Sequence, residues 1–101
     1  GLVTTASTTY NEPYNLARKF ATLDLISRGR AGWNVVASWS EHEAQNFGLE
    51  TMLDYDTRYA RSTEFVEVVK GLWDSWDDGA LLFDKAAGQY FDEAKMHVLN
   101  H

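Results

Sequence analysis

The chain of 101 residues contains no cysteine, a single proline and fewer basic than acidic side chains. Without cysteine, neither a disulfide framework nor a thiolate metal site can form, and a cytoplasmic location is expected. The balance of 9 basic to 15 acidic residues gives a net charge of -6. Nucleic acid and anionic membranes bind cationic surfaces, so neither is an expected partner. No apolar run approaches the ~20 residues of a transmembrane helix.

The motifs of several common enzyme classes are also absent. The chain has no Gly-x-Gly-x-x-Gly, no Gly-Lys-Ser/Thr phosphate loop and no nucleophile-elbow serine. The run from His42 to Asn46 begins like the helical zinc motif of metalloproteases, but Asn46 stands where the second histidine is required. We therefore expect no metal site, and the sequence identifies no catalytic residue.

What is present is the composition of a folded domain, with 45% hydrophobic and 14% aromatic residues. Leu16, Phe20 and Leu23 recur at helical spacing and predict an apolar helix face. Gly29 follows, and a glycine can take the left-handed conformation that ends a helix. Residues 31–37 then form an apolar run typical of a parallel strand covered on both faces, and the amide of Asn34 inside it requires a polar partner.

The order of the predicted elements is that of a parallel α/β fold. Ser40 and Glu43 have the spacing of a capping box for a short helix. A (β/α)₈ TIM barrel takes about 250 residues, so residues 1–101 are expected to be a fragment of one domain with two β/α units of an incomplete barrel. Its open sheet edges favour a homo-oligomer. The expected strands cover 1–7, 31–37 and two short pieces within 80–91, and the expected helices cover 13–26, 41–48 and 56–76.

Polar side chains lie where the two predicted parallel strands end, which is the edge at which ligands bind in such folds. Thr4, Thr5 and Ser7 are on the first strand, and Asn34 and Ser38 are on the second. The alternative is that these groups cap turns and satisfy neighbouring backbone groups, and spacing alone favours that interpretation.

Tyr55 and Tyr59 are one helical turn apart at the start of the longest predicted helix, where free N–H groups favour a phosphate. Alternatively, Tyr59 only begins the apolar stripe of that helix. Arg58 and Arg61 could bind an anionic ligand or pair with neighbouring carboxylates, and surface pairing is the commoner case.

Several stretches together resemble the bacterial luciferase-like flavin monooxygenases, in particular the nitrilotriacetate monooxygenase branch. The resemblance covers essentially the whole chain. It lies in residues 5–14 (TASTTYNEPY), 16–24 (LARKFATLD), 29–36 (GRAGWNVV), 46–48 (NFG), 56–61 (DTRYAR) and 65–73 (FVEVVKGLW).

This resemblance implies a TIM barrel that uses reduced FMN, delivered by a separate NAD(P)H:flavin reductase, and O₂ to oxygenate a small organic substrate. Thr5 and Asn34 match flavin-contacting positions of the family, Tyr59 matches a position on the phosphate side, and Ser38 is a further candidate. Tyr55 stands where the family has a histidine. The first two and last four strands of such a barrel are outside these residues, so we expect the segment alone to be inactive.

A rival hypothesis comes from a different class of protein. The chain could be a non-catalytic, acidic α/β protein-interaction module that binds a partner through its tryptophans. The candidate residues are Trp33, Trp39, Trp73 and Trp76. This hypothesis requires tryptophan side chains that are available at the surface.

Overall fold

The computed structural model describes residues 1–101 and confirms the expected order of elements. The long helix ends at Trp73, earlier than expected, because the chain at Trp76 leaves the helix to form a β-bridge with Met96. None of the helices combines the length and apolar character required to span a bilayer. The elements are β1 (Leu2–Ser7), α1 (Pro13–Ser27), β2 (Ala31–Val36), α2 (Glu41–Asn46), α3 (Tyr55–Trp73), β3 (Leu81–Asp84), β4 (Gln89–Phe91) and a 3₁₀ turn (Glu93–Lys95).

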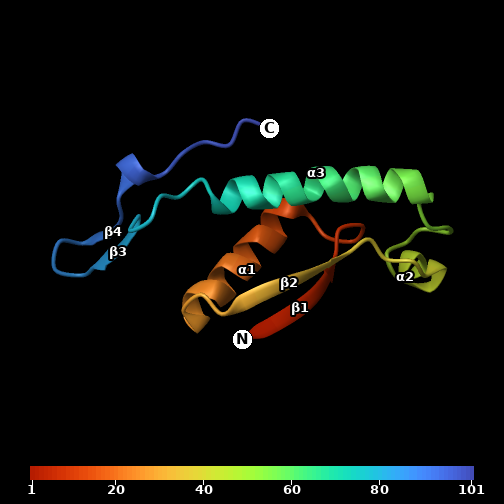
Figure 1. The fold of residues 1–101 in the computed structure, drawn as a ribbon, viewed down its shortest axis with the longest axis horizontal. Helices are drawn as coiled ribbons and strands as arrows, with labels where there is room; N and C mark the ends of the chain where they lie inside the picture. Colours follow the sequence, from red (N-terminus) through yellow and green to blue (C-terminus); the bar gives the residue numbers. More distant parts are fainter.

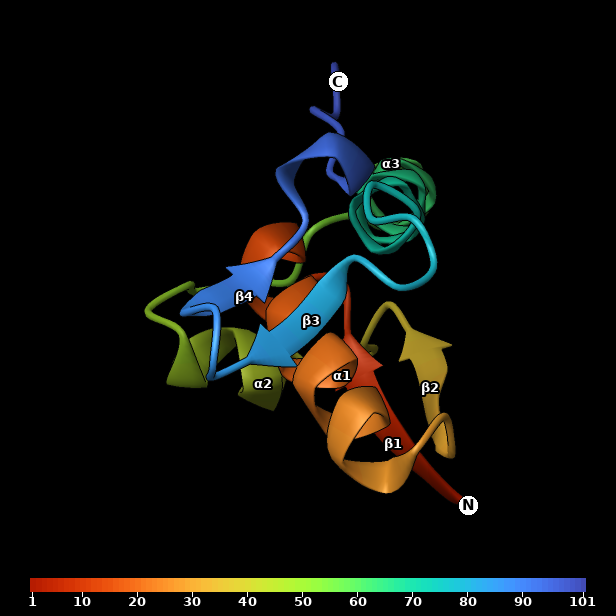
Figure 2. The ribbon, with the colours of Figure 1, turned by 90° about the vertical axis from the view of Figure 1, so that its left-hand side faces the viewer.

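The strands β1 and β2 pair in parallel, as expected, from Leu2 opposite Ala31 to Ser7 opposite Val36. Figure 1 shows both strands running toward the end of the molecule that holds α2 and the start of α3. The strands β3 and β4 form a separate antiparallel pair, which Figure 2 shows as a hairpin apart from the parallel strands. The chain thus contains two β/α units, which is part of the set in a closed barrel.

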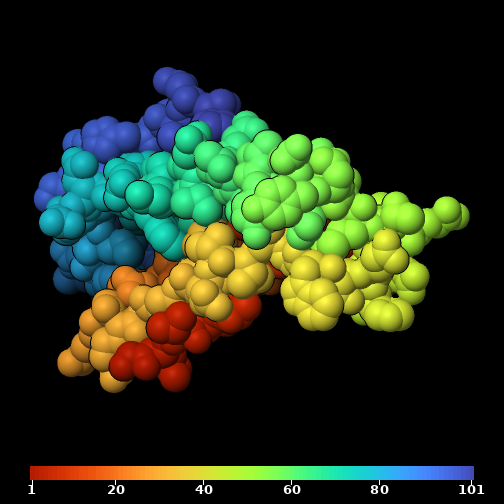
Figure 3. Space-filling view, turned by 45° about the vertical axis from the view of Figure 1, so that its right-hand side comes forward, coloured from red at the N-terminus to blue at the C-terminus, as the bar shows by residue number.

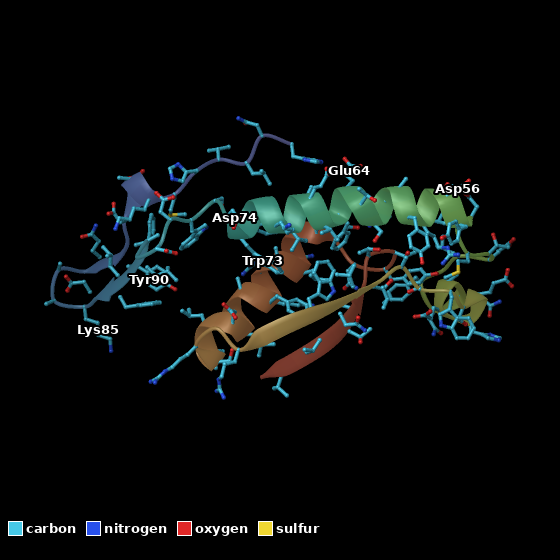
Figure 4. All side chains as sticks on the ribbon, in the orientation of Figure 1. Asp56, Glu64, Trp73, Asp74, Lys85 and Tyr90 are labelled. Carbon is cyan, nitrogen blue, oxygen red and sulfur yellow. The ribbon has the colours of Figure 1, made fainter.

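The core lies where α1 and α3 pack on each other and on one face of the parallel strands. Figure 4 shows Trp73 on the side of α3 that faces α1, with Asp56 and Glu64 on the opposite side. The helix-face prediction for α1 is therefore confirmed at Leu16 and Phe20. The buried cluster consists of Leu16, Ala17, Phe20, Phe65 and Val69.

Trp33 links this core to the sheet. Its ring centroid lies 5.9 Å from that of Phe20, 6.0 Å from that of Phe65 and 6.3 Å from that of Trp73. Its indole N–H donates to the carbonyl of Ala6 at 3.1 Å. Trp33 is therefore a core residue rather than the surface residue that the rival hypothesis requires, whereas Trp39 is 85% exposed.

The end of α1 has the expected left-handed conformation, although Arg28 takes it before Gly29 does. The φ angle is 58° at Arg28 and 78° at Gly29. The Gly29 N–H donates back to the carbonyl of Asp24 at 2.8 Å, which satisfies an otherwise free helix carbonyl. This tight reversal allows β2 to begin only four residues after α1 ends.

Candidate functional site

The uncovered face of the parallel strands holds the first pair of candidate residues. Side chains alternate across a strand, and Ala6 and Trp33 point toward the helices. Thr5 and Asn34 therefore lie on the opposite face, where they are register partners and both are exposed. The Asn34 side-chain N–H donates to the Thr5 hydroxyl at 3.1 Å. The prediction that this strand is covered on both faces is therefore wrong for residues 1–101, since no part of the chain covers the face that carries Asn34.

The second pair of candidate hydroxyls lies at the ends of the two strands. The Ser7 and Ser38 hydroxyl oxygens are 2.6 Å apart, and Ser38 is only 9% exposed. The Ser38 hydroxyl also donates to Glu43 at 3.5 Å, while the Thr9 N–H donates to Ser7 at 3.1 Å. Because a carboxylate only accepts, these bonds run in one direction from Thr9 through Ser7 and Ser38 to Glu43.

The capping-box prediction is wrong in its side-chain contacts. Ser40 is the N-cap residue of α2, but its side chain accepts no capping hydrogen bond. Glu43 bonds Ser38 instead, because the left-handed turn at Ser38, with φ of 62°, brings the strand end next to the first turn of α2. Figure 3 shows the α2 region projecting from the body of the molecule beside the start of α3.

Surface pairing with a carboxylate is confirmed for Arg61 alone, whose guanidinium lies 3.9 Å from the Glu12 carboxylate. The hydrogen bonds of both guanidinium groups go to backbone carbonyls instead. Arg58 reaches the carbonyls of Leu53 and Ser38. These bonds to backbone carbonyls could not be predicted, since the only signal in the sequence is that the two arginines are about one helical turn apart.

Tyr55 and Tyr59 lie together at the start of α3, as their spacing predicts. Their ring centroids are 4.5 Å apart, and the Arg58 guanidinium lies 5.9 Å from the centre of the Tyr55 ring. Both phenols are exposed. The Thr57 amide is not free for an anion, however, because it donates to the Asp54 carboxylate at 3.1 Å. Of the first amides of α3, that of Thr57 is therefore unavailable to an anion, whereas both phenol groups are accessible.

Asp54 makes the stability of α3 dependent on pH. Hydrogen bonds from the Thr57 side chain and backbone hold the pKa of the Asp54 carboxyl below its ordinary value of 3.8. A lowered pKa in the folded state stabilises the fold fully above the ordinary pKa, and that stabilisation is lost as the pH falls through the lowered value. We expect Asp54→Asn to reduce the melting temperature at pH 7 more than at pH 2.5. Circular dichroism melts test this, and an equal reduction at both pH values would contradict it.

One residue near the strand ends was not predicted. Tyr10 follows β1 and stacks on Phe47 with ring centroids 4.7 Å apart and planes within 4°. Its hydroxyl is buried and has no hydrogen-bond partner. No pattern in the sequence marks it, because a lone aromatic residue in a loop has no periodicity from which its contacts can be inferred.

The amino-acid sequence matches a known protein family and several individual proteins. The family model for the luciferase-like monooxygenases matches residues 1–99. The chain is 57% identical over 101 residues to an N-acetyl-S-(2-succino)cysteine monooxygenase of Bacillus subtilis, covering all of this chain and 23% of that protein. It is 58% identical over 101 residues to nitrilotriacetate monooxygenase component A of Aminobacter aminovorans, of which it covers 22%.

Solved structures agree with these sequence matches. The crystal structure of a long-chain alkane monooxygenase superposes with a TM-score of 0.84 at 42% identity, over 98% of this chain and 23% of that one. The structure of a riboflavin lyase with modified FMN and the substrate riboflavin gives a TM-score of 0.86 at 44% identity, over 100% and 23%. The chain thus spans less than a quarter of the length of these relatives.

Proposed function

Because this chain belongs to the luciferase-like monooxygenase family, we propose that the complete protein containing it is a flavin-dependent monooxygenase. It would use reduced FMN, supplied by a separate NAD(P)H:flavin reductase, and O₂ to oxygenate a small organic substrate. The name "component A" of one relative supports a second component, and modified FMN in the riboflavin lyase structure supports the cofactor.

The observation that carries this proposal is the Thr5–Asn34 pair on the open face of the parallel strands. After the bond between them, the second Asn34 N–H, the amide oxygen and the Thr5 hydroxyl proton have no protein partner. These two donors and one acceptor fit the edge of an isoalloxazine ring, on which carbonyl and N–H groups alternate. The flavin would supply the redox chemistry with O₂, while these residues would bind and orient its ring.

The other candidate residues differ in which hydrogen-bonding groups remain unpaired. The Ser38 hydroxyl donates to Glu43 and accepts from Ser7, so we assign it to the flavin rim as an acceptor only. Tyr55 and Tyr59 each keep a free phenol group, and Arg58 lies beside them. We assign both phenols to the phosphate side of FMN, where they would donate hydrogen bonds.

The site assignment is tested by FMN fluorescence quenching in the complete protein under anaerobic conditions. We expect Asn34→Ala and Tyr59→Phe each to weaken FMN binding about tenfold, which is the loss of one good hydrogen bond. Tyr14→Phe is the matched control, because this exposed phenol lies on α1, away from the open face. Unchanged affinity in both test variants would reject the assigned residues, and a wild-type protein that binds no FMN would reject the function.

The unpaired edges of β1 and β2 fit the same proposal. Two parallel strands leave one edge of each without hydrogen-bond partners. The relatives are about four times as long as this chain. We propose that further strands of the complete protein pair with these edges and close a barrel around the Thr5–Asn34 face.

A further inference from the structure

We propose that Arg58 and Arg61 are positioning residues of the flavin site, which hold the two strand-end loops at a fixed separation through four backbone carbonyls. This inference rests on the proposed flavin-binding function. It assigns the hydrogen bonds of these arginines to the protein backbone rather than to an anion, and the only carboxylate contact is the 3.9 Å ion pair of Arg61 with Glu12.

Arg58 fixes the loop that follows β2. Its Nε donates to the carbonyl of Leu53 at 3.1 Å, and its Nη1 donates to the carbonyl of Ser38. One guanidinium therefore joins the strand end to the loop before α3. The Ser38 carbonyl is held in this way while the Ser38 hydroxyl bonds Ser7, so the residue is bonded at both its backbone and its side chain.

Arg61 fixes the loop that follows β1. Its Nε donates to the carbonyl of Thr8 at 2.9 Å, and its Nη2 donates to the carbonyl of Asn11 at 3.0 Å. Thr8 is fully buried and directly follows Ser7. Since a buried carbonyl needs a hydrogen-bond partner, Arg61 supplies one that no nearby backbone N–H provides through secondary structure.

The two arginines act on one feature. Arg61 donates to the carbonyl of the residue after Ser7, and Arg58 donates to the carbonyl of Ser38 itself. Two side chains of α3 therefore restrain both members of the 2.6 Å hydroxyl pair. That pair ends the same two strands that carry Thr5 and Asn34. A shift of either loop would therefore change the distance between the strand ends on which the flavin ring would lie.

The chemistry requires arginine rather than any cation. A guanidinium donates from Nε and Nη in fixed, separate directions, which allows it to bridge two carbonyls. A lysine ammonium keeps the charge but lacks that planar fork. A residue that bound the flavin phosphate directly would be replaced by lysine with less loss, because a point charge still attracts phosphate.

The test measures binding of reduced FMN and of reduced riboflavin, which lacks the phosphate, to the complete protein under anaerobic conditions by quenching of tryptophan fluorescence. We expect Arg58→Lys and Arg58→Gln each to lower the affinity for both flavins by the same factor, about tenfold. Arg18→Gln is the control, because the Arg18 guanidinium lies over the Tyr14 ring on α1 and makes no hydrogen bond to a strand-end loop. It should leave both affinities unchanged.

Four results would overturn the proposal: variants with unchanged affinity, full rescue by Arg58→Lys, a loss confined to FMN, or flavin affinity that falls only as far as the fold is lost. Circular dichroism melts separate the last case. If Arg58→Gln fails to fold, the affinities for the two flavins are compared in Arg61→Lys, which alters the arginine that binds the loop after β1. A wild-type protein that binds neither flavin would reject the proposed function itself, whereas wild-type binding with unaffected variants would reject only the positioning role.

Discussion

Trp33→Ala is expected to lower the free energy of unfolding by about 3 kcal/mol, at the lower end of the range for removing a core tryptophan because the ring is only partly buried. The substitution removes the contacts with Phe20, Phe65 and Trp73 and leaves the Ala6 carbonyl without its indole donor. Folded domains are stable by only about 5–15 kcal/mol, so the loss is a large share of the total. Urea unfolding of the complete protein, followed by circular dichroism, measures it.

Two further substitutions separate the contributions to this effect. Trp33→Phe keeps an aromatic ring in the core but removes the N–H donor, so its cost should be about 1 kcal/mol. Trp39→Ala is the matched control, because Trp39 is 85% exposed, and it should change stability by less than about 0.5 kcal/mol. If Trp39→Ala proved as costly as Trp33→Ala, the assignment of Trp33 to the core would be wrong.

Ser38→Val is expected to cost about 3 kcal/mol, for two reasons. A φ angle of 62° is strained for any side chain with a Cβ, and the second branch of valine adds steric crowding that serine does not have. Loss of the Ser38 hydroxyl also leaves the hydroxyl proton of the half-buried Ser7 without an acceptor, which costs about 1–3 kcal/mol. Thermal or urea unfolding measures this loss, and flavin affinity of the complete protein should fall with it.

Ser38→Gly distinguishes the two causes. Glycine takes positive φ without penalty, so this variant loses only the hydroxyl bonds and should be more stable than Ser38→Val. The opposite order would mean that the left-handed backbone at Ser38 contributes nothing to the cost.

The parallel pairing of β1 and β2 could be predicted because its signals are local and periodic. Leu16 and Phe20 recur at helical spacing, and the residues before and after Gly29 change from helical periodicity to an apolar run. Each of these patterns depends on residues within a few positions of one another. The placement of Thr5 beside Asn34 then follows from the register of two parallel strands.

The same local reasoning failed at Glu43 and at Asn34. The capping-box spacing of Ser40 and Glu43 is correct, but a partner outside that spacing, Ser38, takes the carboxylate. The apolar run around Asn34 predicts a strand with both faces covered, whereas the chain covers only the face toward Trp33. In both cases the deciding contact lies with another part of the structure rather than within the pattern.

The sequence by itself determined the fold class, the family and the residue types at the two strand ends, because these are recorded in side-chain identity and spacing. Only the tertiary structure decided how the site is held together. Arg61 binds carbonyls 53 and 50 residues away, and Arg58 binds one 20 residues away. Because every residue has a backbone carbonyl, no side-chain pattern can indicate which carbonyls an arginine will reach. The position of α3 relative to the two strand ends determines which carbonyls accept these bonds.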